Sequence, residues 1–471
     1  MVSQFEPERV AIALYGYPSS GRQTLTAMLD GYRYRRPSDG RVVVFDLKSR
    51  SDGTPPLISL VLIDATNADG DYGPLIKSAK SATRHSYILY TRADLLPVGF
   101  SPIRLRYLRS QRYLSFTYDI DYISSNLTDQ GCVNALAARL VERLSPVSSP
   151  TSPGVETTWD HLCTTFMDWI ASCFALPTNS KIHRVDDEIS SITTDGDVAR
   201  LVRDAAAWDE ELKRRLHAED ARSVAVHRIT PSLLAKATAS SSERASMEYV
   251  RRHTSIPVPR TYHPHLSWLL MEYIDGHMLS ECWSTLSALM QFRIACTLRL
   301  YVKQMRSLHR PTPGAFDTGY VGGIFFQEEK YGPFDSVRRF RQFCDWVSFE
   351  GWHNVALARH NSGRVPPPLP LSNTGWNPTF IHGDLNHSNI LLDRRGTLWL
   401  LDWDTAGFYP ACLEALAMRL VDDELHPGVM PPSWARYRSF IVGKPTSDEA
   451  EYWLYVYSAI HRFRQYAVDA Y

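Results

Sequence analysis

The sequence predicts a protein in two parts, an N-terminal α/β domain with a parallel sheet and a C-terminal α+β domain in two lobes. Residues 1–145 alternate short apolar runs with helical patterns, which is typical of parallel strands joined by helices. The Ser/Pro-rich stretch SPVSSPTSPG (residues 145–154) predicts a linker over residues 146–158. Residues 159–274 mix strand and helix patterns and residues 275–471 are mainly helical, so we expect a small sheet-containing lobe followed by a larger helical lobe.

The composition argues against several classes of protein. The chain has 471 residues, with 51 Lys and Arg against 51 Asp and Glu, and this zero net charge argues against a nucleic-acid partner. No stretch reaches the roughly 18 apolar residues of a membrane span, and charged residues precede the first apolar run, unlike in a signal peptide. The seven cysteines are dispersed without a CxxC pair, which indicates reduced thiols. A cytoplasmic protein without a membrane partner is expected.

Five apolar runs predict the strands of the N-terminal sheet, and two more predict a hairpin in the helical lobe. The N-terminal runs are Val10–Tyr15, Val42–Phe45, Ile58–Ile63, Tyr87–Tyr90 and Leu114–Ile123, and the hairpin runs are Ile390–Leu392 and Leu398–Asp402.

The most informative motif lies around this hairpin. In FIHGDLNHSNILL (residues 380–392), Asp384 stands on a loop five residues before Asn389, and Asp402 follows thirteen residues after Asn389. The hairpin would bring Asp402 back beside Asn389. Phosphoryl transfer from ATP needs a carboxylate to orient the attacking hydroxyl and oxygen ligands to hold Mg²⁺. The pattern offers one such base and two such ligands, and an acidic surface hairpin is the alternative.

HGDLNHSN followed by LLDWD resembles the signature of the aminoglycoside phosphotransferase and choline kinase family, which has a protein-kinase-like fold. The resemblance implies that Asp384 is the catalytic base and that Asn389 and Asp402 bind Mg²⁺. It also implies an ATP-dependent kinase, and HGD in place of the HRD of protein kinases favours a small-molecule hydroxyl as acceptor. Asp404 stands where many relatives carry glutamate.

The resemblance continues upstream into the small lobe. In the helical stretch ERASMEYVRRH, Glu243 resembles the helix glutamate that pairs with a strand lysine, and Lys236 is the candidate for that lysine. The implied role of the pair is to hold the α- and β-phosphates of ATP. An exposed lysine and a solvated glutamate are the alternative.

LLMEYIDG (residues 269–276) resembles the hinge between kinase lobes, where adenine would bond to the backbone of Glu272 and Ile274. A buried strand that ends at a glycine turn is the alternative. No GxGxxG loop is visible, and the strand candidate Ser223–Arg228 lacks glycine. The acidic segment Val421–Glu424 would suit a cationic substrate, although a solvated helix end is the favoured interpretation.

The N-terminal domain carries a strand, a Gly-x4-Gly loop and a helix, an order that resembles the phosphate loop of P-loop proteins. The glycines are Gly16 and Gly21. Arg22 stands where such loops carry lysine, and Thr24 comes one place after the usual Ser/Thr position, which Gln23 occupies. Because arginine is bulkier and planar, it does not replace lysine equivalently at a phosphate.

Further motifs follow in the order of P-loop small GTPases. LVLID ends at Asp64 like a Walker B strand, TRAD (residues 91–94) resembles a guanine-reading [NT]KxD motif with Asp94 as the base-reading carboxylate, and residues 122–126 resemble a SAK region. The N-terminal part therefore resembles a diverged small-GTPase-type domain. This domain either binds a nucleotide, with GTP as one candidate, or has lost nucleotide binding, and the two alternatives stay equally open. Efficient hydrolysis is not expected.

Two segments interleave basic and aromatic residues, Tyr32–Arg36 and Arg104–Arg109. Nucleic-acid contact is one interpretation, and a solvated loop and helix face is the favoured one.

Three hypotheses for function remain. The first is an ATP- and Mg²⁺-dependent phosphotransferase for an unidentified small-molecule hydroxyl, fused to a degenerate GTPase-like domain. The second is a nucleotide-sensing scaffold or pseudoenzyme whose kinase-like half is a binding module. The third is an atypical protein kinase.

Overall fold

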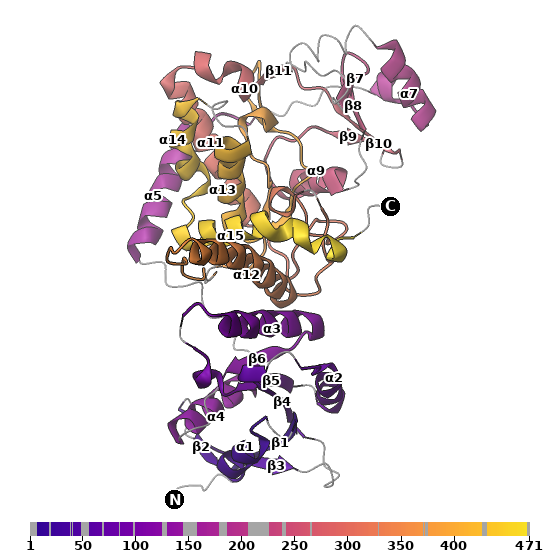
Figure 1. Cartoon of the computed structure of the whole chain (residues 1–471). Helices are drawn as coiled ribbons and strands as arrows, with labels where there is room; N and C mark the ends of the chain where they lie inside the picture. Colours follow the sequence, from indigo (N-terminus) through magenta and orange to yellow (C-terminus); the bar gives the residue numbers. More distant parts are fainter. Residues whose placement is uncertain are drawn as a thin grey trace, which may run out of the picture. The chain divides into compact units, whose positions relative to one another are not determined.

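In the computed structural model the chain forms two compact units, which are coloured along the sequence in Figure 1. One unit comprises Met1–Gly154 and Arg341–Leu369, and the other comprises Val155–Phe340 and Pro370–Tyr471. The predicted linker lies, apart from residue 158, outside the described residues. The structure describes residues 7–468 except for 18–19, 38, 40, 49–55, 68–69, 84, 98, 125–129, 145–157, 179–185, 206–225, 238–241, 264–265, 328, 371, 373–374 and 426–430.

The N-terminal unit is built on a six-stranded sheet of order β2-β3-β1-β4-β5-β6, in which the β2–β3 pair is antiparallel and the other pairs are parallel. Its strands are β1 (Glu8–Gly16), β2 (Arg33–Arg35), β3 (Val42–Lys48), β4 (Ile58–Asp64), β5 (His85–Thr91) and β6 (Asp121–Ser124). Its first helices are α1 (Arg22–Leu29), η1 (Ala65–Asn67), α2 (Gly73–Ala82), η2 (Ala93–Leu95), α3 (Pro102–Tyr118) and α4 (Gln130–Leu144).

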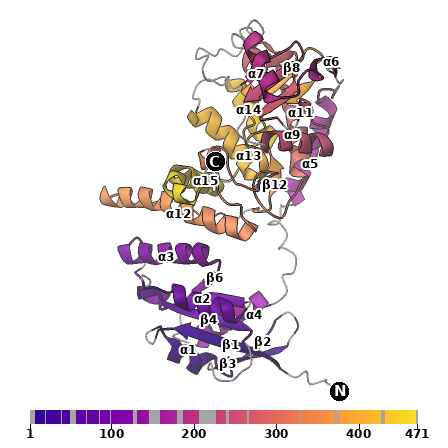
Figure 2. The same ribbon diagram turned by 90° about the vertical axis from the view of Figure 1, so that its right-hand side faces the viewer.

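Helices cover both faces of this sheet. Alternate side chains of β4 enter two separate cores, since Leu60 and Leu62 pack with α1 and α4 whereas Val61 and Ile63 pack with α2 and α3. Figure 2 shows α1 and α3 on opposite sides of the strands. All seven residues of β4 are buried, which explains its continuous apolar sequence. The parallel strands β4 and β5 end together at Asp64 and Thr91, so these residues share one edge of the sheet.

The strand predicted over Leu114–Ile123 is wrong in its first part. Residues up to Tyr118 complete helix α3, and only Asp121–Ser124 form a strand. The side chain of Ser101 caps the helix by accepting a hydrogen bond from the Arg104 N–H, and the helix ends where Asp119 turns left-handed at φ 47°. The cap and the buried positions along the helix outweigh the β-branched and aromatic residues at its end.

The small lobe of the second unit is an antiparallel sheet of order β7-β8-β10-β9 between helices (Figure 1). Met247 and Val250 of one helix pack under one face with Leu269, and Val198 of another packs on the opposite face with Leu270. Its elements are α6 (Asp186–Ile189), α7 (Asp195–Asp204), β7 (Val226–Arg228), β8 (Leu233–Ala237), α9 (Ser242–His253), β9 (Thr261–Tyr262) and β10 (Trp268–Glu272).

The larger lobe is helical and carries two small sheets, β11-β13-β14 and β12-β15. Helix α5 packs on α11 of this lobe, since Asp168 forms ion pairs with Arg299 and Lys303 at 2.8 and 2.7 Å. The predicted small lobe, residues 159–274, therefore contains a helix that packs on the large lobe.

The elements of the larger lobe, together with α5 that packs on it, are α5 (Thr158–Phe174), β11 (Gly276–Met278), α10 (Leu279–Cys282), η3 (Trp283–Thr285), α11 (Ala288–Arg306), η4 (Ile324–Phe326), α12 (Val337–Asn361), β12 (Thr379–Ile381), η5 (His387–Asn389), β13 (Ile390–Asp393), β14 (Leu398–Leu400), β15 (Gly407–Tyr409), α13 (Cys412–Arg419), η6 (Leu420–Leu425), α14 (Pro432–Val442), α15 (Ser447–Ala459) and η7 (Ile460–Tyr466).

Most of helix α12 belongs to the N-terminal unit, which the predicted division into residues 1–145 and 159–471 did not anticipate. Within this unit, Arg109 of α3 binds Glu350 of α12 through two hydrogen bonds of 2.8 and 2.6 Å. Trp346 packs its ring on Tyr113 and Phe116 of α3. Part of the basic and aromatic face of α3 therefore takes part in an intramolecular contact, in which the Arg109 side chain stays 53% exposed.

None of the described helices is both long and apolar enough to cross a lipid bilayer. The seven cysteines all lie within the described residues and form no disulfide bond.

The α3–α12 contact predicts that Trp346→Ala destabilises the N-terminal unit. Trp346 is only 8% exposed, and truncating a buried tryptophan costs roughly 3–5 kcal/mol of unfolding free energy. Hydrogen exchange of the α3 amides should accelerate in the full-length variant. The control Leu357→Ala lies on the same helix, is 40% exposed and should leave the α3 amides unchanged. Equal protection of α3 in the wild type and in Trp346→Ala would contradict the contact.

Candidate active site

The loop after β12 holds the side chain of Asp384 between two amides. Its carboxylate accepts hydrogen bonds from the side-chain amides of Asn386 and Asn389, each at 2.8 Å. Gly383 precedes it at φ 81°, and a Cβ there would lie 2.8 Å from the Thr405 carbonyl oxygen. Only glycine fits this turn, so the HGD sequence positions the aspartate through its backbone as well as through its side chain.

The backbone of Leu401, the residue before Asp402, is hydrogen-bonded to this loop at two points. The Leu401 N–H donates to the Asn389 carbonyl at 2.9 Å, and its carbonyl lies 2.9 Å from Nε2 of His382. Asp402 follows directly in a left-handed conformation at φ 58°. The two motifs predicted to meet are thereby held together, although Asp384 and Asp402 are 18 positions apart in the sequence.

His382 makes this link as a neutral imidazole. The ring is fully buried, Nδ1 accepts a hydrogen bond from the Asp384 N–H at 3.3 Å, and Nε2 therefore donates to Leu401. Burial lowers the pKa of His382 to about 4, so it carries no charge near neutral pH. The histidine is a structural bridge between the two loops.

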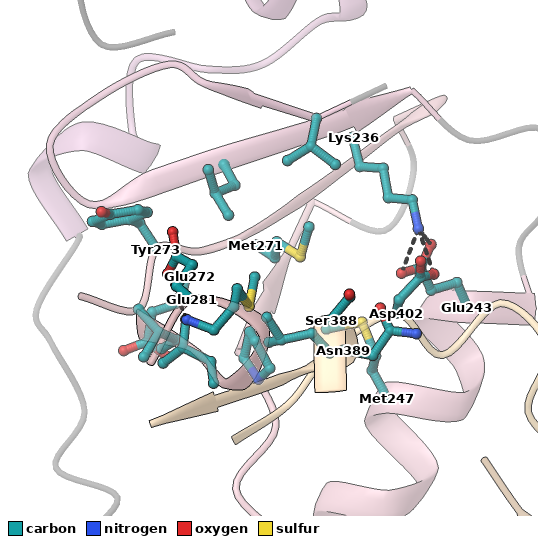
Figure 3. Close-up of a pocket in the computed structure, with 17 residues that line it drawn as sticks. Lys236, Glu243, Met247, Met271, Glu272, Tyr273, Glu281, Ser388, Asn389 and Asp402 are labelled. Carbon is teal, nitrogen blue, oxygen red and sulfur yellow. Dashed lines mark hydrogen bonds and ion pairs between the residues drawn. The ribbon is translucent and has the colours of Figure 1, made fainter. Parts of the chain in front are cut away.

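Lys236, Glu243 and Asp402 form one ionic cluster (Figure 3). Lys236 extends from β8, and its ammonium lies 2.8 Å from Glu243 of α9 and 2.8 Å from Asp402. Burial alone would lower the pKa of Lys236, but the two carboxylates raise it, so the lysine is charged. Burial raises the pKa of Glu243 to about 7, against the opposing effect of Lys236. Glu243 is 2% exposed at its side chain and Asp402 46%, so only the second carboxylate faces solvent freely.

A cavity of about 250 Å³ opens beside this cluster, between the small sheet and the β13–β14 hairpin. Figure 3 shows Lys236 and Asp402 at one end, and Tyr273 and Glu281 at the other. Apolar side chains, among them Val226, Leu234, Met271 and Leu391, form much of the wall. The predicted hinge residues also line it. The Glu272 carboxylate accepts a hydrogen bond from the Arg260 N–H at 3.4 Å. Among the described residues, the Ile274 N–H donates to no backbone carbonyl.

The side chains at this end of the cavity include oxygen donors that suit Mg²⁺, but too few to surround the ion with protein ligands alone. Among the described residues, no group of three or more His, Cys, Asp or Glu side chains could hold a metal ion. Mg²⁺ in phosphate-transfer sites takes one or two protein ligands and completes its shell with phosphates and water. Asn389 and Asp402, which line the same cavity, offer an amide and a carboxylate for this purpose.

Sequence reasoning missed Glu414 of α13, which is hydrogen-bonded to the backbone of the loop that carries Asp384. Its two carboxylate oxygens accept from the backbone N–H groups of His382 and Gly383 at 2.7 and 3.1 Å. It is 1% exposed, and burial raises its pKa to about 7. A glutamate at a helix start 30 residues after Asp384 carries no local signal of this contact.

The acidic segment Val421–Glu424 differs from the expected solvated helix end. Asp422 is 4% exposed and bonds to Arg438 at 3.1 Å and to the Trp434 indole at 3.2 Å. Asp423 also binds Arg438, at 2.8 Å. Burial raises the pKa of Asp422 to about 6. These carboxylates are thus engaged by an internal cation.

The N-terminal candidates lie at the carboxyl edge of the six-stranded sheet. At Gly16 a Cβ would lie 2.4 Å from the Ser20 hydroxyl, and Gly21 adopts φ 81° just before α1, so both positions require glycine. Arg22 and Thr24 are exposed in the first turn of α1, and Asp94 is exposed in η2. The Thr91 hydroxyl ties β5 to this loop by donating to the Ser20 carbonyl at 3.0 Å.

Residues 207–440 match the model of the phosphotransferase enzyme (APH) family. Over these 234 of its 471 residues, the chain is similar to this family. The match confirms the predicted resemblance, and the two-lobed architecture agrees with the predicted kinase-like fold. No curated protein matches the sequence significantly.

Similar solved structures fall into two groups. The gentamicin–APH(2″)-IIa complex is 11% identical, with a TM-score of 0.33 over 55% of this chain and 85% of that chain. The elongation factor SelB from Methanococcus maripaludis in its apo form is 11% identical, with a TM-score of 0.23 over 30% of this chain and 34% of that chain. A bacterial selenocysteine-specific elongation factor, EF-Sec, is 12% identical, with a TM-score of 0.24 over 30% of each chain. The chain spans about a third of the length of these two factors.

The buried charge of Glu414 predicts opposite effects of pH on stability and activity. Its folded pKa of about 7 exceeds the ordinary 4.5, so the folded protein keeps a proton that the unfolded chain releases between these values. Stability from this group should therefore fall by about 3 kcal/mol as pH rises through that window. Activity should rise as the pH passes through about 7, where the folded Glu414 becomes ionised and both of its oxygens become full hydrogen-bond acceptors.

Glu414→Gln should remove this pH dependence of stability and lower kcat about 10- to 100-fold, because a lost hydrogen bond to a charged group costs about 1.5–3 kcal/mol. The readouts are urea unfolding from pH 4.5 to 7.5 and ATP turnover. The control Glu449→Gln removes another buried carboxylate, the cap of α15, and should leave kcat unchanged. An unaltered kcat in Glu414→Gln would refute the anchoring role.

Proposed function

We propose that the C-terminal unit is an ATP- and Mg²⁺-dependent phosphotransferase that acts on a hydroxyl group of a small molecule. The observation that carries the proposal is the backbone of Leu401, whose N–H donates to the Asn389 carbonyl and whose carbonyl accepts from His382. It joins the loop of Asp384 to the cluster of Asp402 and Lys236 at the mouth of one cavity. A base, a cationic phosphate contact and metal ligands are the parts that phosphoryl transfer requires.

Each residue has a role set by its chemistry. Asp384, whose carboxylate is oriented by two amides, accepts the proton of the acceptor hydroxyl and aims its oxygen. Lys236 contacts phosphate oxygens as a point charge, and Glu243 holds its side chain in place. Asn389 and Asp402 would hold Mg²⁺, which supplies positive charge against the phosphate oxygens. Adenine would occupy the apolar end of the cavity, with hydrogen bonds to the backbone of Glu272 and Ile274.

The acceptor is proposed as a small hydroxyl compound. Asp422 and Asp423 share one cation, Arg438, so one of their two charges is balanced within the protein.

A second candidate is a nucleotide-binding module without catalysis. The observation in its favour is the direct ion pair of 2.8 Å between Lys236 and Asp402, which occupies both the phosphate contact and a metal ligand. Calorimetric titration with ATP separates the two functions. A phosphotransferase should bind ATP at least tenfold more tightly with Mg²⁺ than without it, because the metal replaces Lys236 beside Asp402. Equal affinity in both conditions would favour the module.

Asp384→Asn should leave ATP binding nearly unchanged and abolish phosphate transfer. The amide keeps the size of the carboxylate but cannot take up the hydroxyl proton, a loss of the order of 10²–10⁴-fold in rate. ATP affinity by calorimetry and consumption of labelled ATP with a metabolite mixture are the two readouts. Asp448→Asn, an exposed aspartate in the first turn of α15, is the control and should retain full activity. Full turnover in Asp384→Asn would reject the assignment.

Lys236→Met should weaken ATP binding and transfer together. Methionine keeps the length of the side chain but removes the charge, and leaves the buried Glu243 without its cation. The Michaelis constant for ATP should rise at least tenfold. Lys303→Met is the matched control, since Lys303 also pairs with an aspartate, at 2.7 Å, and lies outside the cavity. Similar kinetics in the two variants would exclude Lys236 from the nucleotide site.

A further inference from the structure

The P-loop-like fold of the N-terminal unit implies a Mg²⁺ ion beside the aspartate that ends β4, and the residues there can be tested against this implication. Asp64 lies at the carboxyl edge of the sheet and is 6% exposed. A metal ligand needs an oxygen lone pair that points into open space, and Mg²⁺ demands near-octahedral oxygen ligands at about 2.0–2.1 Å. Both oxygens of Asp64 are instead engaged within the domain.

One oxygen of Asp64 caps the 3-10 turn that follows. Oδ1 accepts from the Thr66 N–H at 2.9 Å and from the Thr66 hydroxyl at 2.7 Å. These bonds hold the carboxylate against η1.

The other oxygen is bound by an arginine from the neighbouring strand. Oδ2 lies 3.1 Å from a guanidinium nitrogen of Arg92. Arg92 follows Thr91, the partner of Asp64 in the β4–β5 register, and adopts φ 58°. This left-handed turn lies at the very edge where β4 ends. A non-glycine residue in this conformation is uncommon, and the ion pair accompanies it.

The ion pair competes with a metal ion for the Asp64 carboxylate. A guanidinium stays charged at every physiological pH, and a charge-assisted hydrogen bond is about twice as strong as a neutral one. A divalent cation on Asp64 would also lie a few ångströms from this fixed positive charge, which repels it. Gln23 stands in α1 where a hydroxyl ligand is expected, the hydroxyl of Thr24 comes one place later, and both side chains are exposed. The residues present therefore do not fit Mg²⁺.

We propose that the guanidinium of Arg92 takes the place of the divalent cation on Asp64, so the N-terminal unit is a metal-independent module. A nucleotide or phosphate bound at the Gly16–Gly21 loop would be held without Mg²⁺, and metal-assisted hydrolysis does not occur there. The proposal concerns the N-terminal unit only and is independent of the function assigned to the C-terminal unit.

The test counts Mn²⁺, a paramagnetic substitute for Mg²⁺, bound to the full-length protein in the presence of GDP, by electron paramagnetic resonance. Asp64→Asn should bind as many ions per chain as the wild type, because Asp64 holds none. Arg92→Ala should bind one more, because it frees the carboxylate. Arg92 is half exposed, with 52% of its side chain accessible, so its truncation should leave the fold intact.

Two further variants make the result specific. The double variant Asp64→Asn/Arg92→Ala should lose the extra ion again. Arg143→Ala breaks the ion pair of 2.7 Å with Asp121 in the same unit and should gain none. The proposal is overturned if Asp64→Asn binds one ion fewer than the wild type, or if Arg92→Ala gains no ion.

Discussion

The candidate active site depends on the backbone of Leu401, which is hydrogen-bonded at two points to the loop that carries Asp384. Its N–H binds the Asn389 carbonyl, and its carbonyl binds a neutral, buried histidine of the HGD sequence. The same histidine and its neighbour Gly383 rest on Glu414, whose burial is costly because its charge has left water. Burying this carboxylate lowers the stability of the protein. Its two hydrogen bonds hold the backbone of the loop that orients Asp384.

Each unit pairs an aspartate that follows a strand with a cation, Asp402 with Lys236 of another sheet and Asp64 with Arg92, which follows the neighbouring strand of the same sheet. Asp402 is half exposed and faces a lysine, a strongly hydrated point charge on a flexible stem. Asp64 is almost buried, is bonded by Thr66 and faces an arginine whose planar group cannot lose its proton. In the functions proposed above, the first pair exchanges its lysine for a metal ion, whereas the second takes the place of the metal.

The sequence predicted features that depend on neighbours in the chain and missed those that depend on distant packing. Asp384, Asn389 and Asp402 lie in one loop and hairpin, so their spacing alone brings them together, and the seven-residue step from Lys236 to Glu243 likewise joins a strand to the next helix. Glu414 was missed because its contact joins α13 to a loop far back in the sequence. The helix α12 was expected only as part of the helical lobe, since its Trp346 shows no local sign of packing on α3. The strand prediction at Leu114 was wrong because helix α3, which is capped by Ser101 at its N-terminus, continues to Tyr118.

The most direct test of the proposed activity is to identify the product of the reaction. The full-length protein would be incubated with Mg²⁺, a metabolite extract and ATP labelled with ¹⁸O in its γ-phosphate, and the mixture analysed by mass spectrometry. The account predicts a new phosphate monoester of a small hydroxylated compound that carries the labelled phosphoryl group. Recovery of the label only in ATP, in inorganic phosphate or in protein would contradict it.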